Sequence, residues 1–158
     1  MNSVTTWKSA KISRFLNSVH RDIRRFILRS VHRADENRNT GEDAKGVTTG
    51  VEFLRSVNLN EDSVHLNGRT VVIGGGNVAM DVAITAKRLG AHNVTMVCLE
   101  QRDSMPANEE EVTRALEEGV KIVNGWGPKE VLRTDGKVSG IVFKNCPQVL
   151  DETGRFNP

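Results

Sequence analysis

The stretch that decides the fold runs from a β-branched segment into a glycine-rich turn: Arg69-Thr-Val-Val-Ile-Gly-Gly-Gly-Asn-Val-Ala79. A short β-branched run of this kind is typical of a buried parallel strand. Three glycines follow it, and residues 77–89 have the pattern of a helix that ends before Gly90. The stretch therefore predicts a strand, a tight turn and a helix in immediate succession.

The turn fits the pattern G-x-G-x-x-A, which covers six consecutive residues: Gly74, Gly75, Gly76, Asn77, Val78 and Ala79. Alone the pattern is weak, because glycines cluster in many loops that bind nothing. Between a strand and a helix it indicates a turn that binds the pyrophosphate of a dinucleotide. Gly74 permits the tight turn, Gly76 lets the backbone approach the phosphates, and Ala79 keeps the helix close to the sheet. Free N–H groups at the start of the helix then face the phosphates.

The alternation of strands and helices continues after this turn. A second β-rich run spans residues 93–99, an acidic helix spans residues 109–118, and a third short strand spans residues 120–123. Two further strands, at residues 129–133 and 137–144, flank an Asp-Gly pair, which is a strong hairpin signal. The predicted fold class is α/β, a Rossmann-like βαβ parallel sheet with a β-hairpin excursion, preceded by an N-terminal amphipathic helix.

An acidic residue follows the second β-rich run, where the ribose of a bound dinucleotide would lie. Glu100 comes 24 residues after Gly76. A carboxylate in that position accepts hydrogen bonds from the adenosine ribose of NAD and repels the 2′-phosphate of NADP. Arg102 follows two positions later and could bind such a phosphate. The residues favour NAD(H) over NADP(H) without fixing the preference.

Charge is distributed unevenly along the 158 residues, although the net charge is only +2. Residues 1–34 contain eight basic residues and one acidic residue, whereas the remainder contains 14 basic and 19 acidic residues. Apolar residues of this first segment recur at three- and four-residue steps, which predicts a basic amphipathic helix: Ile12, Phe15, Leu16, Val19, Ile23, Phe26, Ile27 and Val31. We divide the chain into a helical arm and linker, residues 1–40, and a nucleotide-binding domain, residues 41–158.

The arm has several interpretations. Its helix could pack by the apolar stripe onto the domain, contact an anionic membrane surface or an acidic partner, or act as an organelle presequence. Nucleic-acid binding is not expected, because the domain is acidic and no aromatic-rich surface accompanies the basic residues. No apolar run approaches the ~20 residues of a membrane span. Two cysteines and the lack of a continuous apolar leader favour a cytoplasmic protein without a metal site.

Three stretches of the chain resemble a known family: residues 40–58, residues 72–81, and Met105-Pro-Ala107 with the acidic helix that follows. From about residue 40 to residue 158 the chain is similar to the small (β) subunit of glutamate synthase and its relatives. These are FAD-dependent NAD(P)H oxidoreductases with two dinucleotide-binding domains. The resemblance implies that this segment is the NAD(P)H domain, which holds the nicotinamide against a flavin.

The resemblance also assigns residues. Four of them match the family's cofactor-binding turn: Gly74, Gly76, Asn77 and Ala79. Gly75 fills the variable position, and Asp81 matches an aspartate in the following helix, where a polar residue near the positive end of the helix is the simpler interpretation. NADPH-using relatives carry two adjacent arginines where this chain has Leu99 and Glu100. This departure supports NADH.

The family's flavin fingerprint, a second glycine-rich turn, has no counterpart in residues 1–39. FAD is therefore expected only from sequence outside this chain or from a partner chain. The leading hypothesis is an NAD(P)H-binding domain, or a fragment, that positions nicotinamide for hydride transfer to FAD held elsewhere. Its expected partner is an FAD-binding domain or an electron-acceptor subunit. The alternatives are a non-catalytic nucleotide-binding module and a truncated fragment without independent activity.

No catalytic acid, base or nucleophile is nominated, because in such a domain the cofactor carries the chemistry. Cys98 and Cys146 are predicted to be packing residues. Trp126 either packs or lies over the cofactor cleft. The histidines show no spacing of metal ligands: His20, His32, His65 and His92.

Overall fold

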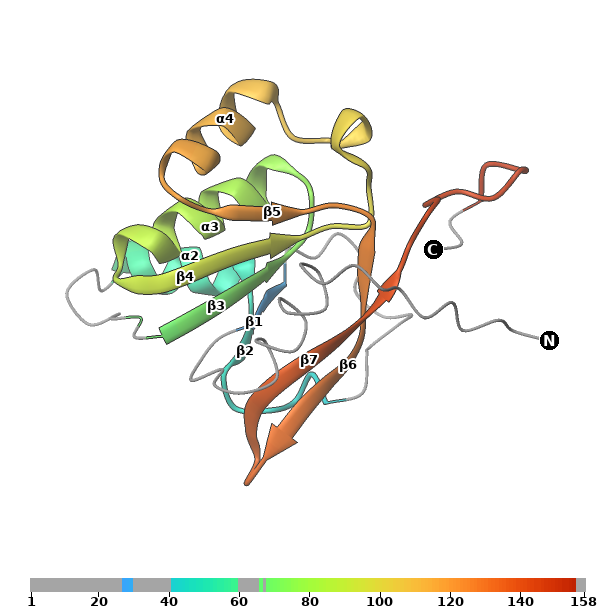
Figure 1. Ribbon diagram of the computed structural model, residues 1–158. Helices are drawn as coiled ribbons and strands as arrows, with labels where there is room; N and C mark the ends of the chain where they lie inside the picture. The colour runs from blue at the N-terminus through green and yellow to red at the C-terminus, as the bar shows by residue number, and fades with distance from the viewer. Residues whose placement is uncertain (1–26, 30–40, 60–65, 67, 156–158) are drawn as a thin grey trace.

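A parallel sheet forms the centre of the computed structural model, which describes residues 27–29, 41–59, 66 and 68–155. Its five strands are ordered β2-β1-β3-β4-β5, with these bounds: β1 (Ile27–Arg29), β2 (Val47–Thr49), β3 (Gly68–Ile73), β4 (Ala91–Val97) and β5 (Lys121–Val123). The helices that connect them lie side by side on one face of the sheet (Figure 1): α2 (Gly50–Leu59), α3 (Asn77–Arg88) and α4 (Glu109–Glu117). A 3-10 turn, η2 (Arg102–Ser104), lies between β4 and α4.

The predicted α/β class is confirmed, and the strands and helices from β3 to β5 lie within two residues of the expected bounds. The predicted hairpin is also present, as antiparallel strands β6 (Trp126–Thr134) and β7 (Lys137–Asn145). Asp135 and Gly136 both have positive φ, 52° and 72°. Asp and Gly tolerate this left-handed conformation, and the tight turn between two strands requires it.

One part of the predicted N-terminal helix is wrong. Residues 27–29 form β1, which pairs in parallel with both β2 and β3. The apolar run from Phe26 to Leu28 fits a central parallel strand as well as a helical stripe, and periodicity cannot separate the two over so few residues. The rest of the predicted arm and linker, residues 1–26 and 30–40, lies outside the described residues.

The main core lies between the sheet and the helices. Val72 and Met96 from the sheet and Met80 from α3 have no exposed surface. Small residues line the same side of α3, and they too are fully buried: Ala79, Ala83 and Ala86. Because alanine adds little bulk, α3 can approach β3 and β4 closely, and the larger side chains fill the space around it.

The hairpin has a small core of its own, which joins it to the sheet. Val131, Val138 and Ile141 are buried and contact side chains from β2 and β3, including Ile73. Backbone hydrogen bonds attach the hairpin to Lys45, whose N–H donates to Gly136 O over 2.9 Å and whose carbonyl accepts from Val138 N over 3.0 Å. The hairpin is therefore packed against the segment before β2 and does not extend free into solvent.

Helix α2 begins with a reciprocal cap that the sequence contains as Thr49-Gly-Val-Glu52. The Glu52 N–H donates to Thr49 Oγ1 over 3.2 Å, and Thr49 N donates back to Glu52 Oε2 over 3.3 Å. These contacts satisfy two groups at a helix start that otherwise lack partners. They also lower the pKa of Glu52, with the Thr49 hydroxyl as the largest cause.

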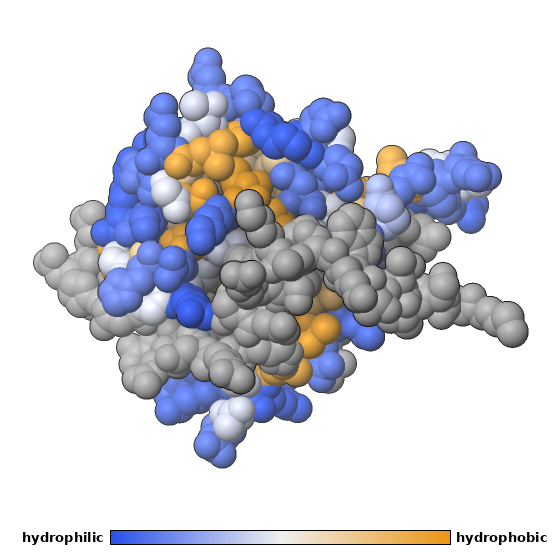
Figure 2. Space-filling model, in the orientation of Figure 1, coloured by the Kyte–Doolittle hydropathy of each residue, from blue (hydrophilic) through white to orange (hydrophobic). Residues whose placement is uncertain are grey.

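Hydrophilic residues cover most of the described surface on the face in Figure 2, with hydrophobic residues showing between them. A globular domain of this size normally exposes some apolar surface. No helix among the described residues is long and apolar enough to cross a membrane.

The core predicts a clear difference between two substitutions to alanine. Met96→Ala removes a fully buried side chain from the central strand β4 and should lower the free energy of unfolding by about 2–5 kcal/mol. Leu116→Ala, on the outer side of α4 where the residue is 49% exposed, should change it by less than about 0.5 kcal/mol. Urea denaturation measures both. Equal losses in the two variants would contradict this account of the core.

Candidate functional site

The glycine turn lies at the carboxyl end of β3, the middle strand of the sheet. β4 and β5 lie on one side of β3, and β1 and β2 lie on the other side. Ligands of open α/β sheets bind outside the carboxyl ends of the strands. Gly74 has φ 142°, which a side chain would strain, and its N–H donates to Val97 O over 3.0 Å. The turn is thus held against the end of β4.

Gly76 borders open space at the start of α3. A Cβ atom built on Gly76 would meet no atom within 4 Å. Its carbonyl accepts the N–H groups of Ala79 and Met80 over 3.0 and 3.2 Å, so α3 starts directly at this residue. No side chain caps the helix, which leaves its first N–H groups facing outward.

Of the other candidate residues in α3, one is buried and the rest are exposed. Ala79 is completely buried against the sheet, as the motif requires. Asn77 and Val78 are exposed in the first turn of α3, and Val78 is 42% exposed. Asp81 is exposed further along the same helix. The residues that the sequence assigns to the turn are therefore contiguous in space, with Ala79 inside and Gly76, Asn77 and Val78 at the surface.

Glu100 stands directly against the glycine turn. A Cβ atom on Gly75 would lie only 2.7 Å from Glu100 Oε2 and 3.1 Å from Cys98 Cβ. The sequence placed Gly75 at the variable position of the turn. In the structure, its missing side chain makes room for the Glu100 carboxylate. Gly75 and Glu100 thus form one feature of the site.

The main chain of Glu100 is fixed by residues that follow β5. Its carbonyl oxygen accepts hydrogen bonds from Asn124 Nδ2 and Gly125 N, both over 3.1 Å. Asn124 Nδ2 also lies 3.2 Å from the Cys98 sulfur. The sequence analysis did not find Asn124. Its signal was its position just after a predicted strand, at the same edge of the sheet as Glu100.

Cys98 is a buried packing residue, as predicted, and is 2% exposed. Burial, followed by the negative charge of Glu100, raises the pKa of the Cys98 thiol to about 12. The thiol is thus protonated at neutral pH and is a poor nucleophile. Cys146 is also buried, and burial raises its pKa. Neither cysteine is suited to covalent or redox chemistry at this edge.

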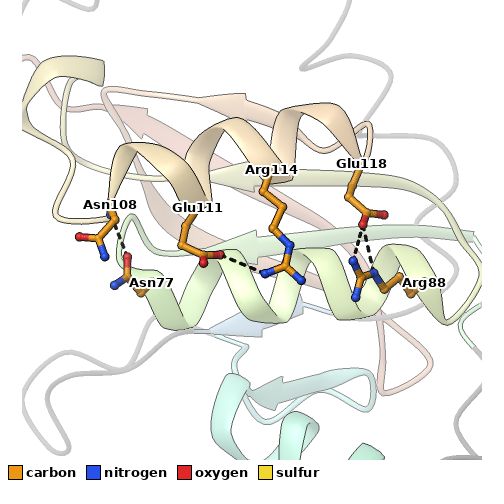
Figure 3. A network of polar contacts seen from close by, with 6 residues as sticks. All are labelled: Asn77, Arg88, Asn108, Glu111, Arg114 and Glu118. Carbon is orange, nitrogen blue, oxygen red and sulfur yellow. Dashed lines mark hydrogen bonds and ion pairs between the residues drawn. The ribbon is translucent and has the colours of Figure 1, made fainter.

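Helix α4 is attached to α3 near both ends, and Figure 3 shows these contacts. At the N-terminal ends, Asn108 N donates to Asn77 Oδ1 over 2.9 Å. At the C-terminal ends, Arg88 Nε donates to Glu118 Oε1 over 3.1 Å, and this contact lowers the pKa of Glu118. Within α4, Glu111 Oε2 accepts no hydrogen bond and lies 3.8 Å from an Arg114 nitrogen.

The loop between β4 and α4 borders the glycine turn because both of its ends are attached there. Glu100, at the first end, lies beside Gly75. At the second end, Ala107 N donates to Gly75 O over 3.1 Å. Arg102, within the loop, forms an ion pair with Glu109 in the first turn of α4, and both side chains are exposed.

The remaining candidates lie around this edge or away from it. Trp126 is half-buried at the start of β6, and its main-chain N–H donates to Cys98 O over 2.9 Å. His92 is exposed on β4, whereas three histidines lie outside the described residues: His20, His32 and His65. Among the residues that the structure describes, no group of three or more His, Cys, Asp and Glu side chains could hold a metal ion.

These features define a class of protein. A parallel sheet, an uncapped helix start after a glycine turn, open space over Gly76 and an acidic residue at the end of the next strand together form a dinucleotide-binding fold. Residues 34–153 match the family described as pyridine nucleotide-disulphide oxidoreductase, and the chain belongs to this family.

Three curated relatives illustrate the range of the family. The chain is 42% identical over 85 residues to the NAD-dependent dihydropyrimidine dehydrogenase subunit PreT of Escherichia coli, covering 54% of this chain and 21% of that protein. It is 39% identical over 129 residues to the glutamate synthase [NADPH] small chain of Halomonas elongata. This match covers 75% of this chain and 27% of that protein. It is 36% identical over 140 residues to the NADP(+)-dependent formate dehydrogenase subunit beta of Moorella thermoacetica. This match covers 84% of this chain and 19% of that protein.

The predicted resemblance to the glutamate synthase small subunit is confirmed by these relatives. The chain spans only about a fifth to a quarter of the length of the three relatives. Solved structures agree on the fold. FprA of Mycobacterium tuberculosis in complex with NADPH has a TM-score of 0.56 at 15% identity, covering 81% of this chain and 44% of that one. Thioredoxin reductase of Lactococcus lactis has a TM-score of 0.52 at 21% identity, and the match covers 84% of this chain and 40% of that one.

The bond between Asn77 and Asn108 gives a test of how the site is held together. Asn77→Ala removes the acceptor of the Asn108 N–H and should lower the free energy of unfolding by about 0.5–1.5 kcal/mol. Asn77→Asp keeps an oxygen acceptor and adds a negative charge at the positive end of α3, so it should cost less. Urea denaturation of both variants measures the difference. An Asn77→Ala variant as stable as the parent protein would show that the bond does not contribute.

Proposed function

We propose that this chain binds NADH across the carboxyl edge of its parallel sheet and positions the nicotinamide for hydride transfer to a flavin held elsewhere. In this proposal the pyrophosphate lies over Gly76 at the start of α3, and Glu100 accepts hydrogen bonds from the adenosine ribose. Asn77 and Val78 contact the cofactor from the first turn of α3. Hydride transfer is chemistry of the nicotinamide itself, so the chain's own contribution is binding and orientation.

The observation that carries the proposal is the pairing of open space with a carboxylate. A Cβ atom on Gly76 would meet no atom within 4 Å apart from its neighbours in the chain, which suits close approach of a phosphate. Glu100 lies beside the preceding residue, Gly75, with its main-chain carbonyl fixed by Asn124 and Gly125. A positive helix end favours the phosphates, and a carboxylate favours a ribose with a free 2′-hydroxyl.

The names of two relatives indicate different nicotinamide cofactors. The Escherichia coli relative is called NAD-dependent, and the glutamate synthase small chain is called an NADPH protein. We favour NADH for this chain because Glu100 would repel a 2′-phosphate. Arg102, the residue that could attract one, is paired with Glu109.

The flavin in this proposal is FAD, bound by other sequence or by a partner chain that passes the electrons onward. The relatives named above are subunits or chains of larger enzymes. We therefore propose an FAD-binding domain or an electron-acceptor subunit as the partner, in the cytoplasm. The final acceptor is set by that partner, because the site described here contacts only the nicotinamide cofactor.

Calorimetry of the purified protein with NADH tests the proposal. Gly76→Asp places bulk and negative charge where the pyrophosphate would lie and should weaken NADH binding by about tenfold or more. Thr134→Asp adds the same charge at the exposed end of the hairpin and should leave the affinity unchanged. If the parent protein binds neither NADH nor NADPH, the proposed function is wrong. If Gly76→Asp binds as well as the parent, the assignment of the turn is wrong.

Reversing the charge at Glu100 tests the ribose contact separately. Glu100→Arg removes a carboxylate acceptor and supplies a cation for a 2′-phosphate, so the ratio of NADPH to NADH affinity should rise by about tenfold or more. Glu110→Arg makes the same charge change at an exposed residue of α4 and serves as the control. The two ratios are measured by titration under identical salt conditions. Equal ratios in both variants would exclude Glu100 as the residue that selects the cofactor.

A further inference from the structure

Arg102 is the cation nearest in sequence to the proposed ribose contact. It follows Glu100 by two residues and begins the 3-10 turn η2, which a hydrogen bond from Ser104 N to Gln101 O closes over 3.1 Å. The loop that carries Arg102 is attached to Gly75 and Asn77 at its far end. A guanidinium in this loop is therefore held at the border of the glycine turn.

The Arg102 guanidinium already forms an ion pair within the protein. It donates to Glu109 Oε1, and this ion pair joins the loop to the first turn of α4. Three consecutive glutamates begin that helix, Glu109, Glu110 and Glu111, but among the described ion pairs only Glu109 is paired with Arg102. Arg102 and Glu109 remain 43% and 73% exposed, so an incoming anion can compete for the guanidinium.

We infer that Glu109 helps to set the cofactor preference, by holding Arg102 away from the 2′-phosphate of NADPH. Glu109 is thus a positioning residue that acts through Arg102 and contacts no cofactor itself. The inference rests on the proposed function, because it presumes that the cofactor occupies the glycine turn.

The size of the effect follows from the exposure of the pair. Exposed ion pairs contribute little to stability, so releasing Arg102 should raise the affinity for NADPH by about two- to fivefold. The affinity for NADH should stay the same, because NADH has no 2′-phosphate. The gain should shrink as salt is added, since the new contact is an exposed charge pair.

The experiment compares NADH and NADPH binding by calorimetry in the parent protein and three variants. Glu109→Gln should raise NADPH affinity two- to fivefold at low salt. Glu110→Gln removes the same charge from the same helix turn without releasing Arg102, and it should change NADPH binding less. Arg102→Ala combined with Glu109→Gln should abolish the gain, because the cation that would bind the phosphate is absent.

The outcomes separate this inference from the proposed function. If the parent protein binds neither nucleotide, the proposed function itself is wrong. If the parent binds NADH but Glu109→Gln leaves the NADPH affinity unchanged, only the role of Glu109 is overturned. An equal gain in Glu110→Gln, or a gain that persists without Arg102, would also overturn it, because a general change in charge would then explain the result.

Discussion

The close approach of α3 to the sheet is the constraint on which the rest of the structure depends. Fully buried alanines line the inner side of this helix, with Val72 and Met96 opposite them in the sheet. This packing fixes where α3 begins and therefore where its free N–H groups lie. Helices α2 and α4 flank α3, so their positions follow from its own. A larger residue at Ala79 would move the helix and the proposed phosphate site together.

Residues outside the glycine turn hold each end of the candidate site. Asn124 and Gly125, after β5, fix the main chain of Glu100. Asn108, before α4, bonds to Asn77 at the start of α3. In these contacts Glu100 and Asn108 take part through main-chain atoms, whereas Asn124 and Asn77 use their side-chain amides. The side chains of Glu100 and Asn108 can therefore vary while the contacts are retained, but those of Asn77 and Asn124 cannot.

The sequence predicted the part of the fold in which local signals agree. Around the glycine turn, the β-branched strand, the glycines and the helix pattern all indicate one structure, and the Asp-Gly pair correctly located the hairpin. Helix α2 was not predicted, although its capping pair, Thr49 and Glu52, is visible in the sequence. The contact between Gly75 and Glu100 could not be predicted, because it depends on where two separate strands end.

Strand β1 has a consequence for how the domain assembles. Ile27 pairs with Val47 and with Val71, which are 20 and 44 positions further along the chain. The first of the described strands in chain order therefore lies between β2 and β3, and this part of the sheet forms through contacts that are distant in sequence, which slow folding. A recombinant fragment beginning at residue 41 would leave β2 and β3 facing a gap, with their backbone N–H and C=O groups unpaired on that side. The smallest autonomous unit must include the residues of β1.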